Sequence, residues 1–321
     1  MSVSDASAQV VAVTRELPVT APFRLDLTAW ALRRRSRNRI DVWDGHYRRV
    51  LVVEGALVTI VVSQGTTAGP PTLGVTLSGT AEDLTEDRIV STCALLRRTL
   101  GLDANLSAFY RLTRHDEDLA GLVRRFRGVR PPRFPTVFEG LVNAVACQQF
   151  SLEVGIELLN RLTDAYGLAV PGPQAPCAAF PEPVALASLS PSELRQLGFS
   201  TQKSRTLIGL GEAAASGQLK DMDLEHLDID QASRALQGLS GIGRWSAEYV
   251  LLRGLGRLSV YPGDDVGARN KLRALLGDPG PLDYDGIARI TARWEPFAGM
   301  VYFHLLLAGL ADRNILSNTN P

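Results

Sequence analysis

The first third of the chain alternates between apolar and polar residues, a pattern typical of β-strands. It follows a polar leader over residues 1–20. Two β-branched runs flank Glu54-Gly55, which predicts a hairpin. Strand-like runs occupy residues 23–28, 48–53, 56–62 and 72–78, and helix-like segments occupy residues 30–35 and 84–100. We therefore expect residues 21–112 to form an α+β domain, a small antiparallel sheet backed by two helices.

After residue 112 the strand signals disappear and helical periods separated by Gly, Pro and Ser clusters replace them. One helix start has a clear cause, because Ser190-Pro191-Ser192-Glu193 is a capping box with proline at the first helical position. Further helices are expected over residues 201–215, 229–236, 244–254, 265–276, 284–294 and 296–309. Residues 113–321 should therefore form an all-α region.

Composition narrows the classes of protein. The 321 residues carry 34 Lys and Arg and 34 Asp and Glu, so any contact with nucleic acid must be local. The three cysteines form no C-x-x-C pair, which excludes a disulfide scaffold, a Cys-only zinc site and a four-cysteine iron–sulfur cluster. The first residues do not resemble a signal peptide, and the longest apolar run, residues 297–311, is too short to span a bilayer. We expect a cytoplasmic protein with no membrane partner.

The segment with the most chemical information is a glycine turn between two helices, Gly241-Ile242-Gly243, followed by Arg244. Glycines let a ligand approach the backbone closely, and the new helix presents unpaired N–H groups at its positive dipole end. Such a turn binds a phosphate well. The alternative is an ordinary helix corner in which glycine only ends one helix and frees the next.

Twenty residues later, Pro262-Gly263-Asp264-Asp265-Val266 places two carboxylates at a helix N-terminus. Together with the turn, this loop resembles the helix-hairpin-helix (HhH-GPD) DNA glycosylase superfamily, and most of all its AlkA-type 3-methyladenine DNA glycosylases. The likeness covers residues 20–315 and extends to segments 144–151, 197–205 and 293–304. It implies a TBP-like front domain ahead of the glycosylase helices.

The resemblance implies a DNA glycosylase that flips an alkylated purine out of double-stranded DNA and hydrolyses its bond to the sugar, in base excision repair. Asp265 takes the place of the catalytic aspartate, whose charge stabilises the positive charge that develops on the sugar. Asp264 then caps the helix or orients the loop. The alternative for Asp265 is that it only caps its helix.

Trp245 stands where the strand-cleaving branch of the superfamily has a lysine nucleophile, so we expect no AP-lyase activity. Trp245 and Tyr249 share one helix face and, by resemblance, line the base pocket, although both could instead be core residues. The pattern departs from the AlkA type at Val266 and Leu306, where the family has aromatic residues. The remaining aromatic faces attract a cationic base. A pocket with fewer aromatic walls would rely more on the intrinsic weakness of the alkylated glycosidic bond, so we expect charged 3-methyladenine or 7-methylguanine to be preferred over neutral bases.

The resemblance also assigns contacts to DNA. Gly241, Gly243, Arg244 and Ser246 should hold the phosphate near the lesion. From the loop at residues 148–150, Gln148, Gln149 and Phe150, a side chain should fill the gap left by the flipped base, with Gln149 and Phe150 as the candidates. The family implies no organic cofactor and no metal site, apart from a structural monovalent cation on the hairpin carbonyls.

Two basic runs, residues 33–37 and 124–127, either track the DNA backbone or form solvated helix faces, and the second reading is favoured. We expect a monomer. Two rival functions stay open: a DNA-binding protein without activity that uses the hairpin as a phosphate clamp, and a glycosylase for oxidised bases.

Overall fold

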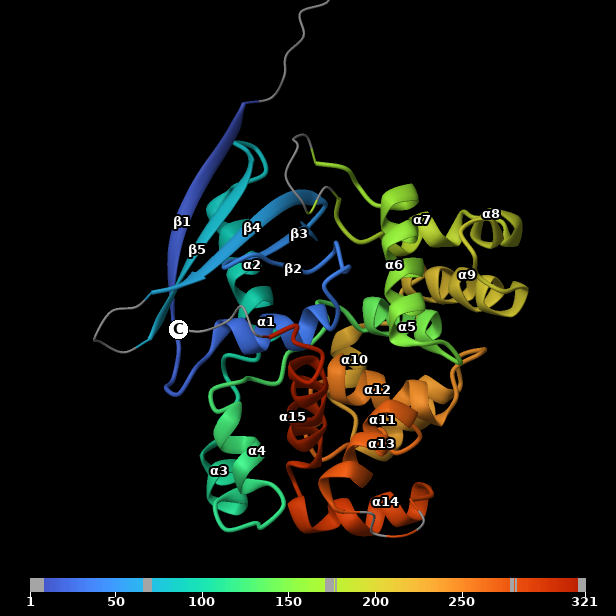
Figure 1. Ribbon diagram of the computed structural model, residues 1–321. Helices are drawn as coiled ribbons and strands as arrows, with labels where there is room; N and C mark the ends of the chain where they lie inside the picture. Colours follow the sequence, from blue (N-terminus) through green and yellow to red (C-terminus); the bar gives the residue numbers. More distant parts are fainter. Residues whose placement is uncertain are drawn as a thin grey trace, which may run out of the picture.

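The computed structural model describes residues 9–65, 71–170, 176, 178–277, 280 and 282–316. A twisted sheet with two helices packs beside a larger group of helices, and helix α15 (Ala298–Ala311) lies among the helices near the centre of the view (Figure 1). The predicted α+β fold followed by an all-α region is confirmed. None of the helices in the described ranges has both the length and the hydrophobicity that crossing a bilayer requires.

The sheet is antiparallel throughout and has the strand order β1-β5-β4-β3-β2. Along its strands every second side chain is buried, as in β4, and these side chains share a core with α1 and α2. Glu54 and Gly55 both have positive φ and form the predicted two-residue hairpin turn, with Val53 paired to Ala56. The strands are β1 (Val10–Pro18), β2 (Val42–Trp43), β3 (Tyr47–Val53), β4 (Ala56–Gln64) and β5 (Thr72–Thr80); the helices are α1 (Leu25–Arg33) and α2 (Glu86–Thr99).

Two predictions for this domain were wrong. Residues 10–18 were assigned to a polar leader but form β1, because their alternating pattern suits an edge strand; residues 1–8 lie outside the described residues. Residues 23–28 were expected to be a strand but lie mostly in α1. That helix is buried on two faces, with Leu25 and Ala29 against the sheet and Trp30 against the helical region. A helix buried on two faces loses the simple amphipathic period.

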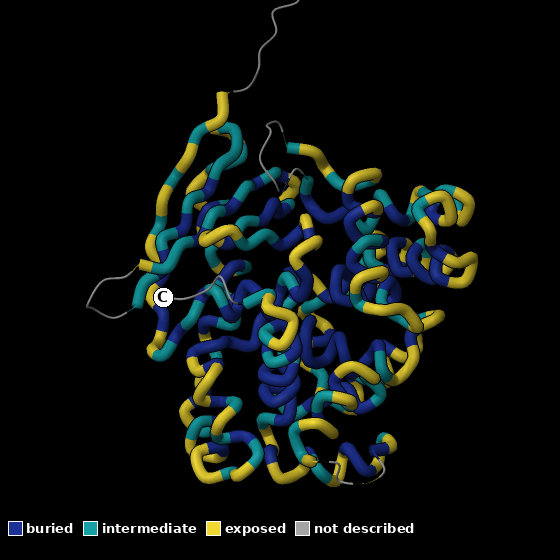
Figure 2. The backbone as a smooth tube through the Cα atoms, viewed as in Figure 1, coloured by how far each residue is buried: buried dark blue, intermediate teal, exposed yellow. Residues whose placement is uncertain are grey.

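The helical region has two adjoining cores. One surrounds α5 and α9, the other surrounds α15, and α12 contributes side chains to both. The helix α15 is buried on nearly all sides (Figure 2). The helices are α3 (Ser107–Thr113), α4 (Ala120–Arg125), α5 (Val137–Cys147), α6 (Leu152–Tyr166), α7 (Pro183–Ala187), α8 (Pro191–Gln196), α9 (Thr201–Ala215), α10 (Asp221–Glu225), α11 (Ile229–Gln237), α12 (Arg244–Arg253), α13 (Val266–Leu275), α14 (Tyr284–Thr291), the 3₁₀ turn Ala292–Trp294, and α15.

The predicted boundary between residues 112 and 113 falls inside α3. The ring of Phe109 in this helix lies 5.8 Å from that of Phe297 and 5.3 Å from that of His304, which belongs to α15. Helix α3 therefore packs with the helical region, and the change from one core to the other comes before residue 107.

Candidate active site

The hairpin between α11 and α12 depends on its first glycine. Gly241 has a φ of +81°, and a Cβ there would lie 2.1 Å from Oγ1 of Thr206. At Gly243, the N-cap of α12, a Cβ would meet no atom within 4 Å. The buried side chain of Ile242 anchors the turn. The space beside Gly243 is therefore open at the start of α12, where the first N–H groups of a helix have no partner within the helix and can bind an anion.

Asp265 is fixed by hydrogen bonds to both carboxylate oxygens. As the N-cap of α13, it accepts a bond at Oδ1 from the backbone N–H of Ala268 at 2.9 Å. At Oδ2 it accepts a bond from the hydroxyl of Tyr302 on α15, also at 2.9 Å. Burial, and then the charge of Asp265, raise the pKa of Tyr302, so this hydroxyl keeps its proton and donates it.

Helix α12 also holds the loop that carries Asp265. Arg244 pairs with Asp264 Oδ2 through Nε at 2.9 Å and Nη2 at 2.8 Å, so Asp264 orients the loop while Asp265 caps α13. Glu248, one turn further on, accepts bonds from the N–H of Gly263 at 3.2 Å and the hydroxyl of Tyr284 at 2.5 Å. Hairpin and carboxylate are thus parts of one framework.

Between these parts lies a cavity of about 1110 Å³. The rings of Trp245 and Tyr249 stack along its wall with centroids 5.5 Å apart. Tyr249 is buried and Trp245 is partly exposed. The side chain of Val266 is 57% exposed and that of Leu306 is partly buried, so these two walls offer no aromatic stacking. The stacked pair of Trp245 and Tyr249 therefore provides a flat, polarisable surface that Val266 and Leu306 do not.

Every residue that the sequence assigned to the site lines this cavity: Asp265, Trp245, Tyr249, Val266, Leu306, Gly241, Gly243, Arg244, Ser246, Gln148, Gln149 and Phe150. Gln148 and Ser246, which were expected to contact DNA, instead bind each other within the protein. Nε2 of Gln148 donates to the carbonyl of Gly241 at 3.0 Å and to Oγ of the buried Ser246 at 2.9 Å. These two side chains therefore join the α5–α6 loop to the hairpin, and the Ser246 hydroxyl is engaged inside the protein.

The tip of the α5–α6 loop projects from this joint. Gln149 has a φ of +57° and is exposed, and the Phe150 side chain is 43% exposed. Lys203 on α9 holds the base of the loop, donating to the carbonyls of Ala146 at 3.1 Å and Gln148 at 2.6 Å. Its Nζ also lies 4.0 Å from the centre of the Phe150 ring. Burial lowers the pKa of Lys203 to about 8.

Sequence reasoning missed the contribution of the front domain to the cavity. Arg34, which caps the C-terminus of α1 with a φ of +60°, lines the cavity although only 3% of it is exposed. Its Nη1 donates to the hydroxyl of Tyr249 at 2.7 Å and its Nη2 to Oδ1 of Asn143 at 2.6 Å. Arg35 is also buried, so the solvated helix face favoured for this basic run is wrong at both positions.

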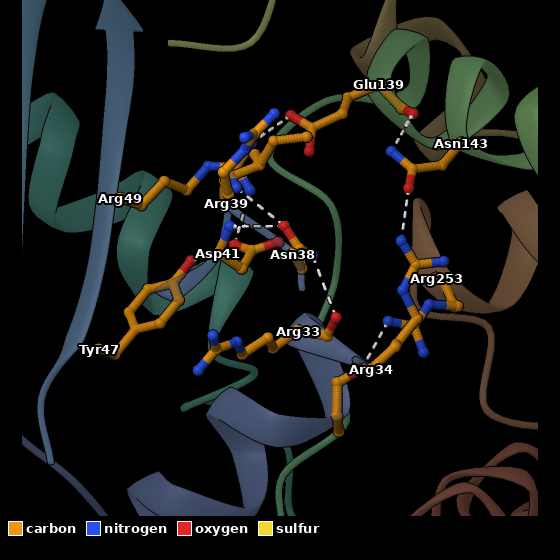
Figure 3. Close-up of polar contacts among 12 residues, drawn as sticks. Arg33, Arg34, Asn38, Arg39, Asp41, Tyr47, Arg49, Glu139, Asn143 and Arg253 are labelled. Carbon is orange, nitrogen blue, oxygen red and sulfur yellow. Dashed lines mark hydrogen bonds and ion pairs between the residues drawn. The ribbon is translucent and has the colours of Figure 1, made fainter. Parts of the chain in front are cut away.

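A second buried arginine ties the sheet to the helices. Arg49 on β3 donates to Asp41 Oδ1 at 2.8 Å and to Glu139 Oε2 on α5 at 2.5 Å (Figure 3). Asn143, one turn after Glu139, donates to the backbone carbonyl of Glu139 and accepts from Arg34. The sequence does not distinguish these buried residues from ordinary surface charges, because Arg49 and Glu139 are 90 residues apart in the chain.

The described residues contain no group of three or more His, Cys, Asp or Glu side chains placed to hold a metal ion. The cavity brings together the start of α12, a carboxylate with hydrogen bonds at both oxygens, a stacked aromatic pair and the buried cations Arg34 and Arg35.

Comparison with known proteins gives this arrangement a family. The model of the HhH-GPD superfamily of base excision DNA repair proteins matches residues 142–296. The chain is 30% identical to DNA-3-methyladenine glycosylase of Bacillus subtilis, over 64% of this chain and 67% of the relative. It is also 30% identical to DNA-3-methyladenine glycosylase 2 of Escherichia coli, over 63% of this chain and 70% of the relative.

A solved structure supports the fold. The 3-methyladenine DNA-glycosylase of Archaeoglobus fulgidus superposes with a TM-score of 0.79 at 24% identity, over 93% of this chain and 98% of that one. The chain belongs to the HhH-GPD superfamily of base excision DNA repair proteins, in the branch of the DNA-3-methyladenine glycosylases.

Proposed function

We propose that this protein is a monofunctional glycosylase that excises alkylated purines from double-stranded DNA, with Asp265 as its catalytic residue. The observation that carries the proposal is the carboxylate of Asp265, held at both oxygens on the wall of a cavity that also contains the stacked rings of Trp245 and Tyr249. A flipped purine fits between the carboxylate and the rings.

In the reaction the C1′–N bond breaks and its electron pair leaves with the base. The sugar then carries positive charge, and the fixed carboxylate of Asp265 stabilises it without having to reorganise. A water molecule adds its oxygen to C1′ and loses a proton, which leaves an abasic site. Trp245 supplies no amine for attack on C1′, so no Schiff base forms and the strand stays intact.

The DNA strand is held next to this cavity. The N–H groups at the start of α12, after Gly243, bind a phosphate, and Arg244 stays on Asp264 to keep the hairpin aligned. Gln149 or Phe150 enters the duplex where the base has left, because both are exposed at the loop tip. A monovalent cation on the hairpin carbonyls belongs to the same proposal, and the enzyme acts as a monomer.

Asp265→Asn tests the proposal. With methylated DNA as substrate, the wild type should release 3-methyladenine and 7-methylguanine and leave sites that break only after alkali. Asp265→Asn should lose at least about a hundredfold in rate while keeping DNA affinity, because the amide has the shape of the carboxylate but no charge. Asp264→Asn is the matched control and should keep most of the activity.

Equal release by the wild type and by Asp265→Asn would contradict catalysis by this residue, and no release by either protein would favour a clamp without activity. Strand breaks that appear before alkali would contradict the monofunctional assignment.

A further inference from the structure

The strongest unexplained feature of the cavity is the charge of Arg34. Among the described residues, no carboxylate lies within ion-pair distance of its guanidinium, and its hydrogen bonds go to the neutral oxygens of Tyr249 and Asn143. The two acids buried in the same interface, Asp41 and Glu139, are both bound by Arg49 (Figure 3). Buried charges are normally paired, so this one is unusual.

Another buried arginine, Arg253, provides a comparison with Arg34. Arg253 on α12 is 1% exposed, donates to the carbonyl of Ala31 at 2.8 Å, and lies over the ring of Phe134, as Arg34 does. It does not line the cavity, whereas Arg34 does. A guanidinium is permanently protonated, so the charge of Arg34 acts on whatever occupies the cavity.

We propose that Arg34 sets the base preference of this glycosylase, by disfavouring a base that carries positive charge and favouring one that leaves with negative charge. The proposal rests on the proposed function, because it concerns the same cavity. It also revises the expectation of a preference for cationic bases, which was based on the aromatic residues and on the weak glycosidic bond of an alkylated base.

The two kinds of base differ in how charge moves when the bond breaks. A 7-methylguanine is cationic in DNA, and the electron pair of its C1′–N9 bond makes it neutral as it leaves. Hypoxanthine is neutral in DNA, so the same electron pair makes it an anion, which later takes a proton from water. A fixed cation in the pocket wall weakens binding of the first base and stabilises the departing form of the second.

The experiment compares kcat/KM for 7-methylguanine and hypoxanthine in the same duplex sequence, under single-turnover conditions. Arg34→Gln keeps an N–H donor near Tyr249 and Asn143 but removes the charge, and should raise the ratio of 7-methylguanine to hypoxanthine excision about tenfold. Arg34→Lys keeps the charge and should keep the ratio near that of the wild type. Because the ratio is measured within one enzyme preparation, partial unfolding cancels.

Arg253→Gln is the matched control. It removes a buried guanidinium that does not reach the cavity, so it should lower both rates by the same factor. An unchanged ratio in Arg34→Gln overturns the proposal, and so does the same change of ratio in Arg253→Gln. A wild type that releases 7-methylguanine but no hypoxanthine also overturns it, while the proposed function stands. A wild type that releases neither base, from these duplexes or from methylated DNA, contradicts the proposed function instead.

Discussion

The cavity has two sides that are built in different ways. The hairpin side comes from one short stretch of chain, in which the glycine turn is followed by α12 with Trp245 and the two groups that hold the loop of Asp265. The opposite side comes from the front domain, where Arg34 reaches a partner 215 residues away in sequence. The hairpin side depends on backbone geometry and the front-domain side on buried charge. Substitutions on the two sides should therefore change different measured quantities.

The largest effect should follow from breaking the charge network of the front domain. Arg49→Met leaves Asp41 and Glu139 buried without their cation, which should lower the free energy of unfolding by about 3–5 kcal/mol. Urea unfolding measures this loss. Arg48→Met is the control, because Arg48 forms a partly exposed pair with Asp44 and should cost less than about 1 kcal/mol. Similar losses in both variants would show that the Arg49 network does not join the domains as described.

On the hairpin side, two neighbouring glycines should respond differently to alanine. Gly241→Ala combines a left-handed φ with a Cβ placed 2.1 Å from Thr206 Oγ1, and should cost about 2–4 kcal/mol of stability. Gly243→Ala meets no protein atom, so stability should hardly change while DNA affinity falls severalfold. Thermal unfolding and fluorescence anisotropy with duplex DNA measure the two quantities. Unchanged DNA affinity in Gly243→Ala would be evidence against phosphate binding at this position.

The same contrast explains what the sequence could predict. The hairpin turn at Glu54-Gly55 and the capping box at Ser190 follow from residues close together in the chain, whose conformations are set by local sterics and hydrogen bonds. For the same reason Asp265 was correctly placed at a helix N-terminus. The grouping of Gly241 with Asp265 in one site came from the resemblance to the family.

The missed features depend on contacts between distant segments. Residues 10–18 alternate as an edge strand does, but they form β1 only because β5 pairs with them, and the segment itself does not specify that pairing. Arg34 stood in a run of arginines with no local sign of burial, and Tyr302 lay in an apolar helix where a buried tyrosine is ordinary. No periodic pattern indicates that such a side chain will meet a carboxylate or a tyrosine hydroxyl from another element.

A substitution of Tyr302 tests whether its hydrogen bond to Asp265 contributes to catalysis. Tyr302→Phe removes the hydrogen bond at Oδ2 but keeps the ring, so kcat should fall about tenfold while KM and DNA affinity stay unchanged. Tyr261→Phe is a close control, since its buried hydroxyl has no hydrogen-bond partner among the described residues and its ring packs edge-on against Tyr302. If both variants lost equal activity, packing rather than positioning of the carboxylate would be the cause.

The smallest effect should come from Lys203, which connects the hairpin side to the loop tip. Its pKa in the folded protein, about 8, lies below the ordinary value of 10.5, so above pH 8 it loses the charge over the Phe150 ring, while the neutral amine still donates to the loop carbonyls. Between pH 8 and pH 10.5 Lys203 binds more protons in the unfolded chain than in the folded one, so its contribution to the free energy of unfolding rises with pH. From pH 7 to 9 we expect the DNA affinity of the wild type to fall about two- to threefold more than that of Lys203→Met. Since the protein does not become less stable through Lys203 over this range, such a decline would come from the loop and not from unfolding. Equal pH dependence in the wild type and in Lys203→Met would show that the charge of Lys203 does not contribute to holding the loop on DNA.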